Sequence, residues 1–254
     1  MATLTPALSD ALGVGPGDMV AIVGGGGKTT ALYRLGDELA ARGTAVLLTG
    51  TTRFTPPAHG TAPNLTIVDD VDALLRVATN GPWPRTVATG HGTKGRLLPL
   101  PPQWLDQLHR ARPSLAIVIE ADGSAMRPFK APAHHEPVIP ALSTLVVACA
   151  GMDVVGRPLT EAHVHRPERV AALTGTQLDE CVTAEVVAAV LAHPQGGHKS
   201  VPLGARWVAL LNKADTPSRR AAADQIATRL RAAGERVVIA QLTREPCVVE
   251  SAIQ

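Results

Sequence analysis

The feature that most constrains this chain is a run of four glycines, residues 24–27, between an apolar segment and an amphipathic one. Residues 19–23 have the composition of a buried strand, and residues 29–41 repeat leucine on one face of a helix that Gly43 ends. Glycines let several backbone N–H groups converge on one anion without side-chain clash. We therefore expect a strand, a tight anion-binding turn, and a helix whose N-terminus adds partial positive charge.

A lysine and two threonines follow the glycines and complete the sequence of a phosphate-binding loop. In such a loop the lysine reaches the β- and γ-phosphates of a nucleotide, and the next hydroxyl completes the shell of a Mg²⁺ ion. The usual pattern has a glycine six residues before the lysine, where this chain has Ile22, so the loop is tighter than usual. The alternative is a glycine-rich turn that happens to precede a lysine. The predicted nucleotide-binding residues are Gly24, Gly25, Gly26, Gly27, Lys28, Thr29 and Thr30, with Thr29 also on the metal.

Apolar runs of strand length alternate along the chain with helical patterns, which is typical of a parallel sheet covered by helices. We expect strands at residues 19–23, 45–48, 66–68, 86–88, 115–119, 145–148, 207–211 and 236–240. We expect helices at residues 29–41, 70–78, 165–193 in two pieces divided near Gly175, and 218–233, with residues 127–140 and 194–204 mostly loop. The prediction is a single domain over residues 1–254 with a three-layer α/β, P-loop NTPase-like fold and a mainly parallel sheet.

Composition and charge exclude several classes of protein. The formal net charge is +2 and the basic residues are dispersed rather than gathered in a stripe, so we expect no nucleic acid partner. The three cysteines lack CxxC spacing, which favours a reducing compartment over a disulfide framework or a zinc site. No apolar run approaches the ~20 residues that span a bilayer, and residues 1–10 lack a signal-peptide pattern. We expect a cytoplasmic protein with no membrane association.

A pair of carboxylates follows the apolar run of residues 117–119 as Glu120-Ala121-Asp122, ahead of a glycine–serine turn. In phosphate-loop proteins such a strand lies beside the first one and presents an acid to the metal. Side chains alternate along a strand, so Glu120 and Asp122 should share one face. We assign Asp122 to Mg²⁺ and Glu120 to the orientation of water or a partner group. The alternative is a simple Asp-Gly-Ser turn.

Threonine hydroxyls follow the second predicted strand, within residues 49–52. We expect one of them, with Thr51 as the catalytic candidate, to contact the γ-phosphate or the metal as a switch does. Arg53 would then stabilise the charge on a transferred group. A threonine-rich surface loop is the alternative.

The sequence Asn212-Lys213-Ala214-Asp215 follows the strand expected at residues 207–211 and resembles the N-K-x-D element of GTPases. In that element the aspartate accepts hydrogen bonds from guanine N1–H and N2–H₂, a donor pair that adenine lacks. Asn212 and the stem of Lys213 would shape the base pocket, so we expect GTP rather than ATP. The alternative is that Asn212 and Asp215 only cap a helix around a turn.

A histidine-rich segment follows the two carboxylates and contains Lys130, His134, His135 and Glu136. A His-His-Glu cluster can bind a transition metal or act as acid–base catalyst, although adjacent histidine rings point in different directions in most backbones. Contact with a substrate or partner, a metal site and a structural role all stay open at this point.

A second polar cluster contains His163, His165 and Arg166. We expect it to form an anion-binding edge. The alternative is that Glu168 pairs with Arg166 at the start of a solvated helix.

Taken in order along the chain, these segments resemble the YqeC family. The matching segments are residues 24–30, 49–54, 120–124, 130–132, 135–140, 151–159 and 164–166, within a similarity that runs from about residue 20 to residue 215. The short glycine loop is typical of the family, whereas the family more often has a run of threonines where this chain has Thr-Gly-Thr-Thr. The resemblance implies an accessory factor for selenium-dependent molybdenum hydroxylases that acts in selenium cofactor biosynthesis or insertion.

The leading hypothesis is therefore a Mg²⁺-dependent GTP-binding protein, a slow GTPase, which by its family resemblance assists the maturation of a molybdenum hydroxylase. Two alternatives stay open. One is a kinase or nucleotidyl-type transferase that uses ATP or GTP on a small cofactor precursor, with the histidine–lysine segment as acceptor site. The other is a non-catalytic nucleotide-binding scaffold. The oligomeric state is left open.

Overall fold

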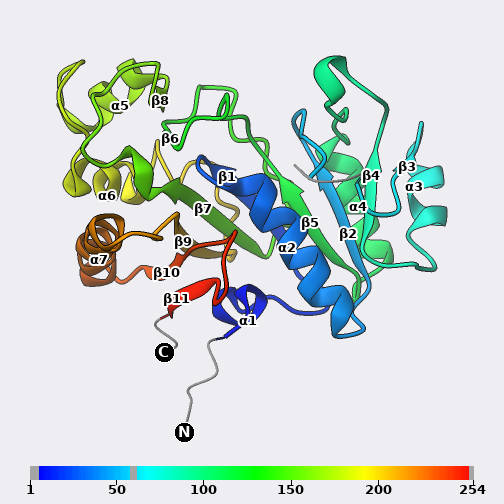
Figure 1. The fold of residues 1–254 in the computed structure, drawn as a ribbon. Helices are drawn as coiled ribbons and strands as arrows, with labels where there is room; N and C mark the ends of the chain where they lie inside the picture. The colour runs from blue at the N-terminus through cyan, green and yellow to red at the C-terminus, as the bar shows by residue number, and fades with distance from the viewer. Residues whose placement is uncertain (1–5, 58–61, 252–254) are drawn as a thin grey trace, which may run out of the picture.

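The computed structural model describes residues 6–57 and 62–251 and is organised around a nine-stranded sheet (Figure 1). The strand order is β11-β10-β9-β7-β1-β5-β2-β4-β3, and β11 pairs antiparallel with β10 while all other neighbours are parallel. The strands are β1 (Met19–Gly24), β2 (Val46–Gly50), β3 (Thr66–Ile67), β4 (Arg85–Ala88), β5 (Ala116–Glu120), β7 (Leu145–Gly151), β9 (Arg206–Asn212), β10 (Arg236–Ala240) and β11 (Val248–Ser251). The predicted α/β fold with a mainly parallel sheet is confirmed.

The central strands are buried on both faces, which explains why they read as continuous apolar runs rather than as alternating patterns. β1 lies between β5 and β7, and its Val20 is paired in register with Val118 on one side and Leu145 on the other. Because all three strands are parallel, their carboxyl ends meet at one edge of the sheet. The glycine loop after β1 and the carboxylates after β5 therefore come together.

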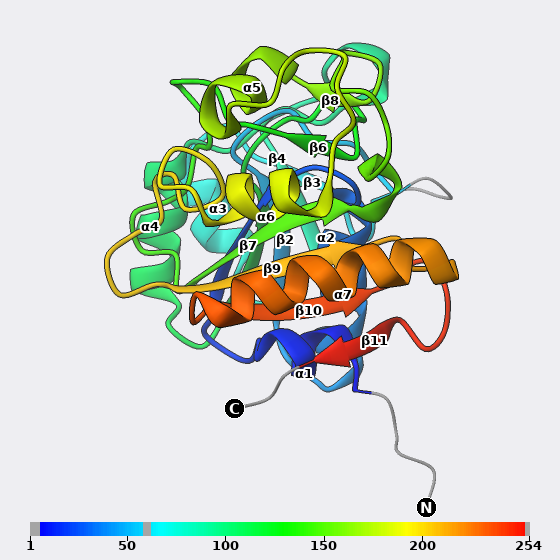
Figure 2. The ribbon, with the colours of Figure 1, turned by 90° about the vertical axis from the view of Figure 1, so that its left-hand side faces the viewer.

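Helices cover both faces of the sheet and make three layers (Figures 1 and 2). α1 (Leu8–Leu12) and α2 (Lys28–Ala41) share one apolar cluster with one face of the strands. α3 (Val71–Val77), α4 (Pro102–Ala111), α5 (Pro167–Thr174), α6 (Ala184–Ala192) and α7 (Pro217–Ala232) contribute to the cluster on the other face. Figure 2 shows α6 and α7 on the side of the sheet away from α2.

Local sequence signals account for several helix ends. Gly175, in the left-handed conformation, ends α5 and so confirms the predicted division of residues 165–193. The Asp70 carboxylate accepts a hydrogen bond from the N–H of Ala73 at 2.6 Å and caps α3. Pro217 occupies the first turn of α7 behind the capping Thr216.

Some short elements escape the sequence patterns. β6 (Phe129–Lys130) and β8 (Val164–His165) pair in a separate two-stranded sheet that lies with α5 beyond the main sheet (Figure 2), and β6 forms inside the segment expected to be mostly loop. The sequence analysis also missed α1, α4 and β11, and the short 3₁₀ segments Thr93–Gly95 and Met152–Val154. Elements of two to five residues carry too few positions for a periodic pattern. This reason does not apply to α4, which has 10 residues.

Over the described ranges, no helix combines the length and the apolar character needed to cross a membrane. The prediction about a missing signal-peptide pattern concerned residues 1–10, of which residues 1–5 lie outside the described residues.

Candidate functional site

The glycine loop (residues 24–27) joins β1 to α2 in a conformation that requires glycine. Gly24, Gly26 and Gly27 have φ angles of 91°, 78° and 138°. A Cβ on Gly26 would lie 2.4 Å from the backbone nitrogen of Gly151, and one on Gly27 would lie 2.2 Å from the side-chain nitrogen of Asn212. The loop therefore packs against β7 and β9 with no space for side chains, and α2 begins directly behind it at Lys28.

A pocket of about 300 Å³, here called the loop pocket, opens over the glycine loop and the N-terminus of α2. The first N–H groups of a helix have no partner within the helix, and they favour an anion placed there. Five basic residues and one carboxylate contribute to the lining, namely Lys28, Arg53, Arg96, Arg127, Lys213 and Glu120. The lining of the loop pocket thus carries more positive than negative charge. Arg96 and Arg127 belong to no recognisable motif, and the sequence analysis missed both.

Lys28 is folded back onto the glycine loop. Its Nζ donates to the carbonyl oxygen of Gly24 at 2.6 Å and lies 3.3 Å from Asp122 Oδ1, an ion pair without hydrogen-bond geometry. Only 4% of Lys28 is exposed. Burial alone would lower the pKa of Lys28, but Asp122 and Glu120 outweigh burial and the pKa is raised. The lysine is therefore charged at neutral pH.

The two carboxylates after β5 occupy different surroundings. The Thr29 hydroxyl donates to Glu120 Oε2 at 2.8 Å, and both residues line the loop pocket. Burial raises the pKa of Glu120, against the opposing effects of Lys28 and the Thr29 hydroxyl. Asp122 is only 1% exposed and lies outside the lining of the loop pocket; its Oδ2 accepts from the N–H of Gly24 at 3.0 Å. The structure thus places Glu120, rather than Asp122, beside Thr29 in the pocket.

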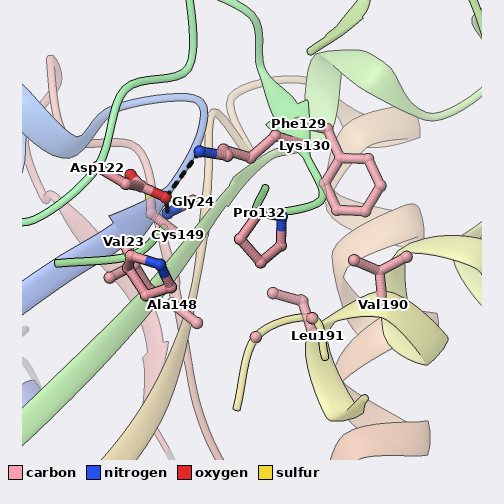
Figure 3. Close-up of a pocket in the computed structure, with 13 residues that line it drawn as sticks. Val23, Gly24, Asp122, Phe129, Lys130, Pro132, Ala148, Cys149, Val190 and Leu191 are labelled. Carbon is pink, nitrogen blue, oxygen red and sulfur yellow. Dashed lines mark hydrogen bonds and ion pairs between the residues drawn. The ribbon is translucent and has the colours of Figure 1, made fainter. Parts of the chain in front are cut away.

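Asp122 also forms a buried ion pair with Lys130 (Figure 3), which links it to further charged residues. Lys130 Nζ lies 3.0 Å from Asp122 Oδ2 and also contacts a carboxylate oxygen of Glu136. Arg166 donates to both oxygens of Glu136, at 2.7 and 3.1 Å. Burial would raise the pKa of Glu136, but Arg166 and Lys130 outweigh burial and lower the pKa to about 2. We call Lys28, Asp122, Lys130, Glu136 and Arg166 the ion-pair chain.

A small cavity of about 20 Å³ lies beside the ion-pair chain (Figure 3). Phe129, Pro132, Cys149, Val190 and Leu191 are among the residues that line it. Its volume is that of roughly one water molecule, too small for a substrate. Lys130 lines this cavity, and its predicted contact with a substrate or partner stays a prediction.

The histidines of the predicted His-rich segment lie at the surface beside this network, and His135 Nε2 is 3.9 Å from Glu136 Oε1. His134 and His135 are exposed, whereas the neighbouring Glu136 is buried. Among the described residues, no group of three or more His, Cys, Asp or Glu side chains has a geometry that could hold a metal ion. His165 is half-buried, and burial together with the charge of Arg166 lowers its pKa. His165 is therefore neutral at pH 7.

Thr51 and Arg53 are close in sequence but differ in exposure and in their relation to the loop pocket. Thr51 is buried, and its hydroxyl donates to the carbonyl oxygen of Val138 at 2.5 Å. It contributes nothing to the lining of the loop pocket. Arg53 is exposed and does line the pocket. The structure thus brings Arg53, and not Thr51, to the glycine loop, and the predicted catalytic role of Thr51 stays a prediction.

The end of β9 reaches the glycine loop through Asn212. Its side-chain nitrogen donates to the carbonyl oxygen of Gly26 at 2.8 Å, and its oxygen accepts from the N–H of Leu242 at 3.0 Å. Lys213 lines the loop pocket and pairs with Asp153 at 2.7 Å. Strand order explains this meeting, because β9 is separated from β1 only by β7.

Asp215 contacts two arginines rather than the glycine loop. Its Oδ1 is 2.7 Å from Arg219, and its Oδ2 is 3.8 Å from Arg244. The hydrogen bond from Arg219 lowers the pKa of Asp215, so the carboxylate is ionised at neutral pH. Asp215 is outside the lining of the loop pocket. Its predicted role as reader of guanine stays a prediction.

Comparison with known proteins agrees with the resemblance seen in the motifs. The family model described as YqeC protein matches residues 20–168, which contain the glycine loop, the carboxylates after β5 and the whole ion-pair chain. An uncharacterized protein YqeC of Escherichia coli (strain K12) is 34% identical over 196 residues, which cover 77% of this chain and 75% of the E. coli protein. The chain belongs to the YqeC protein family.

Proposed function

We propose that this protein is a P-loop nucleotide-binding protein that holds the phosphates of a nucleoside triphosphate in the loop pocket. The observation that carries the proposal is the opening of the glycine loop and the N-terminus of α2 onto a pocket lined by five basic residues. Backbone N–H groups, helix dipole and side-chain charge all favour a polyphosphate at one place.

Lys28 is the residue whose contacts would change most when a nucleotide binds. In the protein alone it is bonded to the carbonyl of Gly24 and paired with Asp122. Phosphate oxygens are better acceptors for an ammonium group than a neutral carbonyl, because the full negative charge of the phosphate also attracts the ammonium. When a nucleotide binds, Lys28 would therefore replace its hydrogen bond to the Gly24 carbonyl by one to a phosphate oxygen. Asp122 would stay neutralised by Lys130 and the N–H of Gly24.

Magnesium fits the oxygen donors at the start of α2. Mg²⁺ prefers hydroxyl, carboxylate and phosphate oxygens, and it neutralises charge on the β- and γ-phosphates when bound. Thr29 and Glu120, already hydrogen-bonded to each other, would hold it. This revises the assignment made from the sequence. Asp122, buried and bonded to Gly24 and Lys130, would instead fix the glycine loop.

GTP is our proposed nucleotide. Asn212 ties the N-K-x-D element to the glycine loop, so a base near Asp215 belongs to the same ligand as phosphates near Lys28. An ionised carboxylate offers about four acceptor positions. Arg219 and Arg244 approach one oxygen each, which leaves acceptor positions for the two guanine donors.

The proposed reaction is slow GTP hydrolysis, which would rest on positioning and charge stabilisation rather than on a covalent intermediate. Arg53 and Arg96 line the pocket and would stabilise charge on the terminal phosphate. From its family we propose a cytoplasmic accessory role in the maturation of a selenium-dependent molybdenum hydroxylase. A nucleotide-dependent transferase is the second candidate, because another pocket, of about 740 Å³, shares Thr29, Thr30 and Arg96 with the loop pocket.

Calorimetric titration of GTP and ATP, each with and without Mg²⁺, tests the proposal. Wild-type protein should bind Mg²⁺–GTP, and Lys28→Ala should bind it about tenfold or more weakly, the value of a lost charge-assisted hydrogen bond. Arg110→Ala, an exposed residue of α4, is the control and should bind like wild type. Failure of the wild type to bind either nucleotide would refute nucleotide binding.

The same titrations test which base is bound, and assays of phosphate release test which reaction occurs. A tenfold preference for ATP, with Asp215→Ala unchanged, would refute the guanine assignment. Phosphate release with GTP alone supports a GTPase, whereas turnover only with an added acceptor supports a transferase. Binding with no turnover under either condition supports a non-catalytic scaffold.

A further inference from the structure

A second and larger pocket lies along α2 next to the loop pocket. It has a volume of about 740 Å³, within the range of small-molecule sites. The two pockets share Thr29, Thr30, Thr55, Arg96 and Met126, so they are neighbouring parts of one hollow. We call the larger one the α2 pocket. Its volume exceeds that of the loop pocket, which is about 300 Å³ and is proposed to hold the phosphates.

The N-K-x-D element contributes to the lining of the loop pocket and not to that of the α2 pocket. Lys213 lines the loop pocket, whereas Asn212, Lys213 and Asp215 are all outside the lining of the α2 pocket. A nucleotide with its base near Asp215 and its phosphates near Lys28 would therefore leave the α2 pocket open. The space calls for a different ligand.

Unpaired positive charge identifies one end of that ligand. Arg96 lines both pockets, Lys94 lines the α2 pocket and Arg53 lines the loop pocket. Within residues 6–57 and 62–251, none of these three forms an ion pair. Asp37 is the acidic residue of the lining. The guanidinium of Arg34 is already paired with Glu38 and Glu245.

Apolar surface identifies the other end. Tyr33, Pro56, Pro57 and Met126 line the α2 pocket. The Tyr33 hydroxyl is anchored on the carbonyl oxygen of Thr55 at 3.3 Å, which fixes its ring. The rigid rings of tyrosine and proline lose little side-chain freedom when an apolar ligand, such as a ring, packs against them.

We infer that the α2 pocket binds a second substrate, a small organic anion with a ring-bearing apolar body, whose anionic group lies at Arg96 next to the terminal phosphate of the nucleotide. The inference rests on the proposed function, since it takes the loop pocket to hold the phosphates. Arg96 half-buried between the two pockets would contact both ligands, and Lys94 would contact the second alone.

The test uses the full chain and the dye anilinonaphthalene sulfonate, which combines aromatic rings with one anionic group and fluoresces when bound. Wild type should bind it saturably at one site, and binding should persist with saturating Mg²⁺ and the non-hydrolysable imido analogue of GTP. Lys94→Glu should lower the affinity of the protein for the dye by tenfold or more. Arg110→Glu makes the same change of charge on the exposed surface of α4 and should leave dye binding within twofold of wild type.

Two outcomes would overturn the inference. Competitive displacement of the dye by the nucleotide analogue would show that the α2 pocket receives the nucleoside. Dye binding equal in Lys94→Glu and wild type would show that no site holding an organic anion through Lys94 exists, against the inference. Calorimetry of the nucleotide analogue on the same samples separates this failure from failure of the proposed function. Lys94-dependent dye binding without any nucleotide binding would refute the nucleotide site and keep the organic-anion site.

Discussion

Replacing Lys130 by methionine removes the central cation of the ion-pair chain while nearly keeping its volume. The Lys130 side chain is 1% exposed and contacts Asp122 at 3.0 Å, the carbonyl oxygen of Gly123 at 2.6 Å, and Glu136. Methionine reproduces the aliphatic stem and none of these contacts. Two carboxylates would then stay buried with fewer partners.

The expected loss of stability depends on the partners that Asp122 and Glu136 keep after the substitution. Removing one partner of a buried ion pair costs about 3–5 kcal/mol, because the other charge stays desolvated. Here Asp122 keeps Lys28 and the N–H of Gly24, and Glu136 keeps both hydrogen bonds from Arg166. We therefore expect the lower end, about 3 kcal/mol. That is a large part of the total stability of about 5–15 kcal/mol of an ordinary protein.

Urea unfolding followed by circular dichroism measures this cost. Lys94→Met is the matched control, because Lys94 is exposed and forms no ion pair with the described residues, and it should change stability by no more than about 0.5 kcal/mol. A cost below about 1 kcal/mol for Lys130→Met would refute the reasoning. In the double variant with Asp122→Asn the cost should be less than the sum of the two single changes, because both act on one ion pair.

Three further predictions concern the glycine loop, the loss of stability at acidic pH and the proposed metal ligands. Gly26→Ala should destabilise the protein by about 1–3 kcal/mol, because φ is 78° and a Cβ would lie 2.4 Å from the nitrogen of Gly151; an unchanged urea midpoint would contradict this. The pKa of Glu136 is lowered from 4.5 to about 2, so the stability that its charge contributes is complete above pH 4.5 and lost as the pH falls towards 2. Acid titration of the unfolding free energy should show this loss, and Glu136→Gln should flatten it; parallel curves would speak against the ion-pair chain. Thr29→Val and Glu120→Gln should each reduce by about tenfold or more the gain in GTP affinity that Mg²⁺ produces, and calorimetry giving the wild-type gain would remove both from the metal site.

Much of the fold could be predicted from local sequence because the signals are local. The apolar run of β1, the glycines and the leucine spacing of α2 each span only a few residues, and Gly175 ends α5 where its position indicated. The alternation of strands and helices predicted a mainly parallel sheet with helices on both faces, which is confirmed. The family resemblance was likewise carried by short ordered motifs and is confirmed.

The short elements and the edge of the sheet could not be predicted in this way. β6 and β8 have two residues each, and they exist because Phe129 and Lys130 pair with Val164 and His165 across a long connection. β11 completes the sheet in the antiparallel direction after a chain of parallel strands. The β6–β8 pair and β11 both form because another strand of the fold has a free edge beside them. The local sequence carries no information about that edge.

By itself, the sequence determined the glycine loop, its helix and the residue types that gather near them. Only the tertiary structure decided which of these residues meet. Asn212 contacts Gly26 across 186 positions because β9 lies two strands from β1, and Glu120 rather than Asp122 reaches Thr29. Strand order and burial set these contacts, because an ion pair or hydrogen bond depends on distance and desolvation in the folded chain, and spacing along the sequence carries neither.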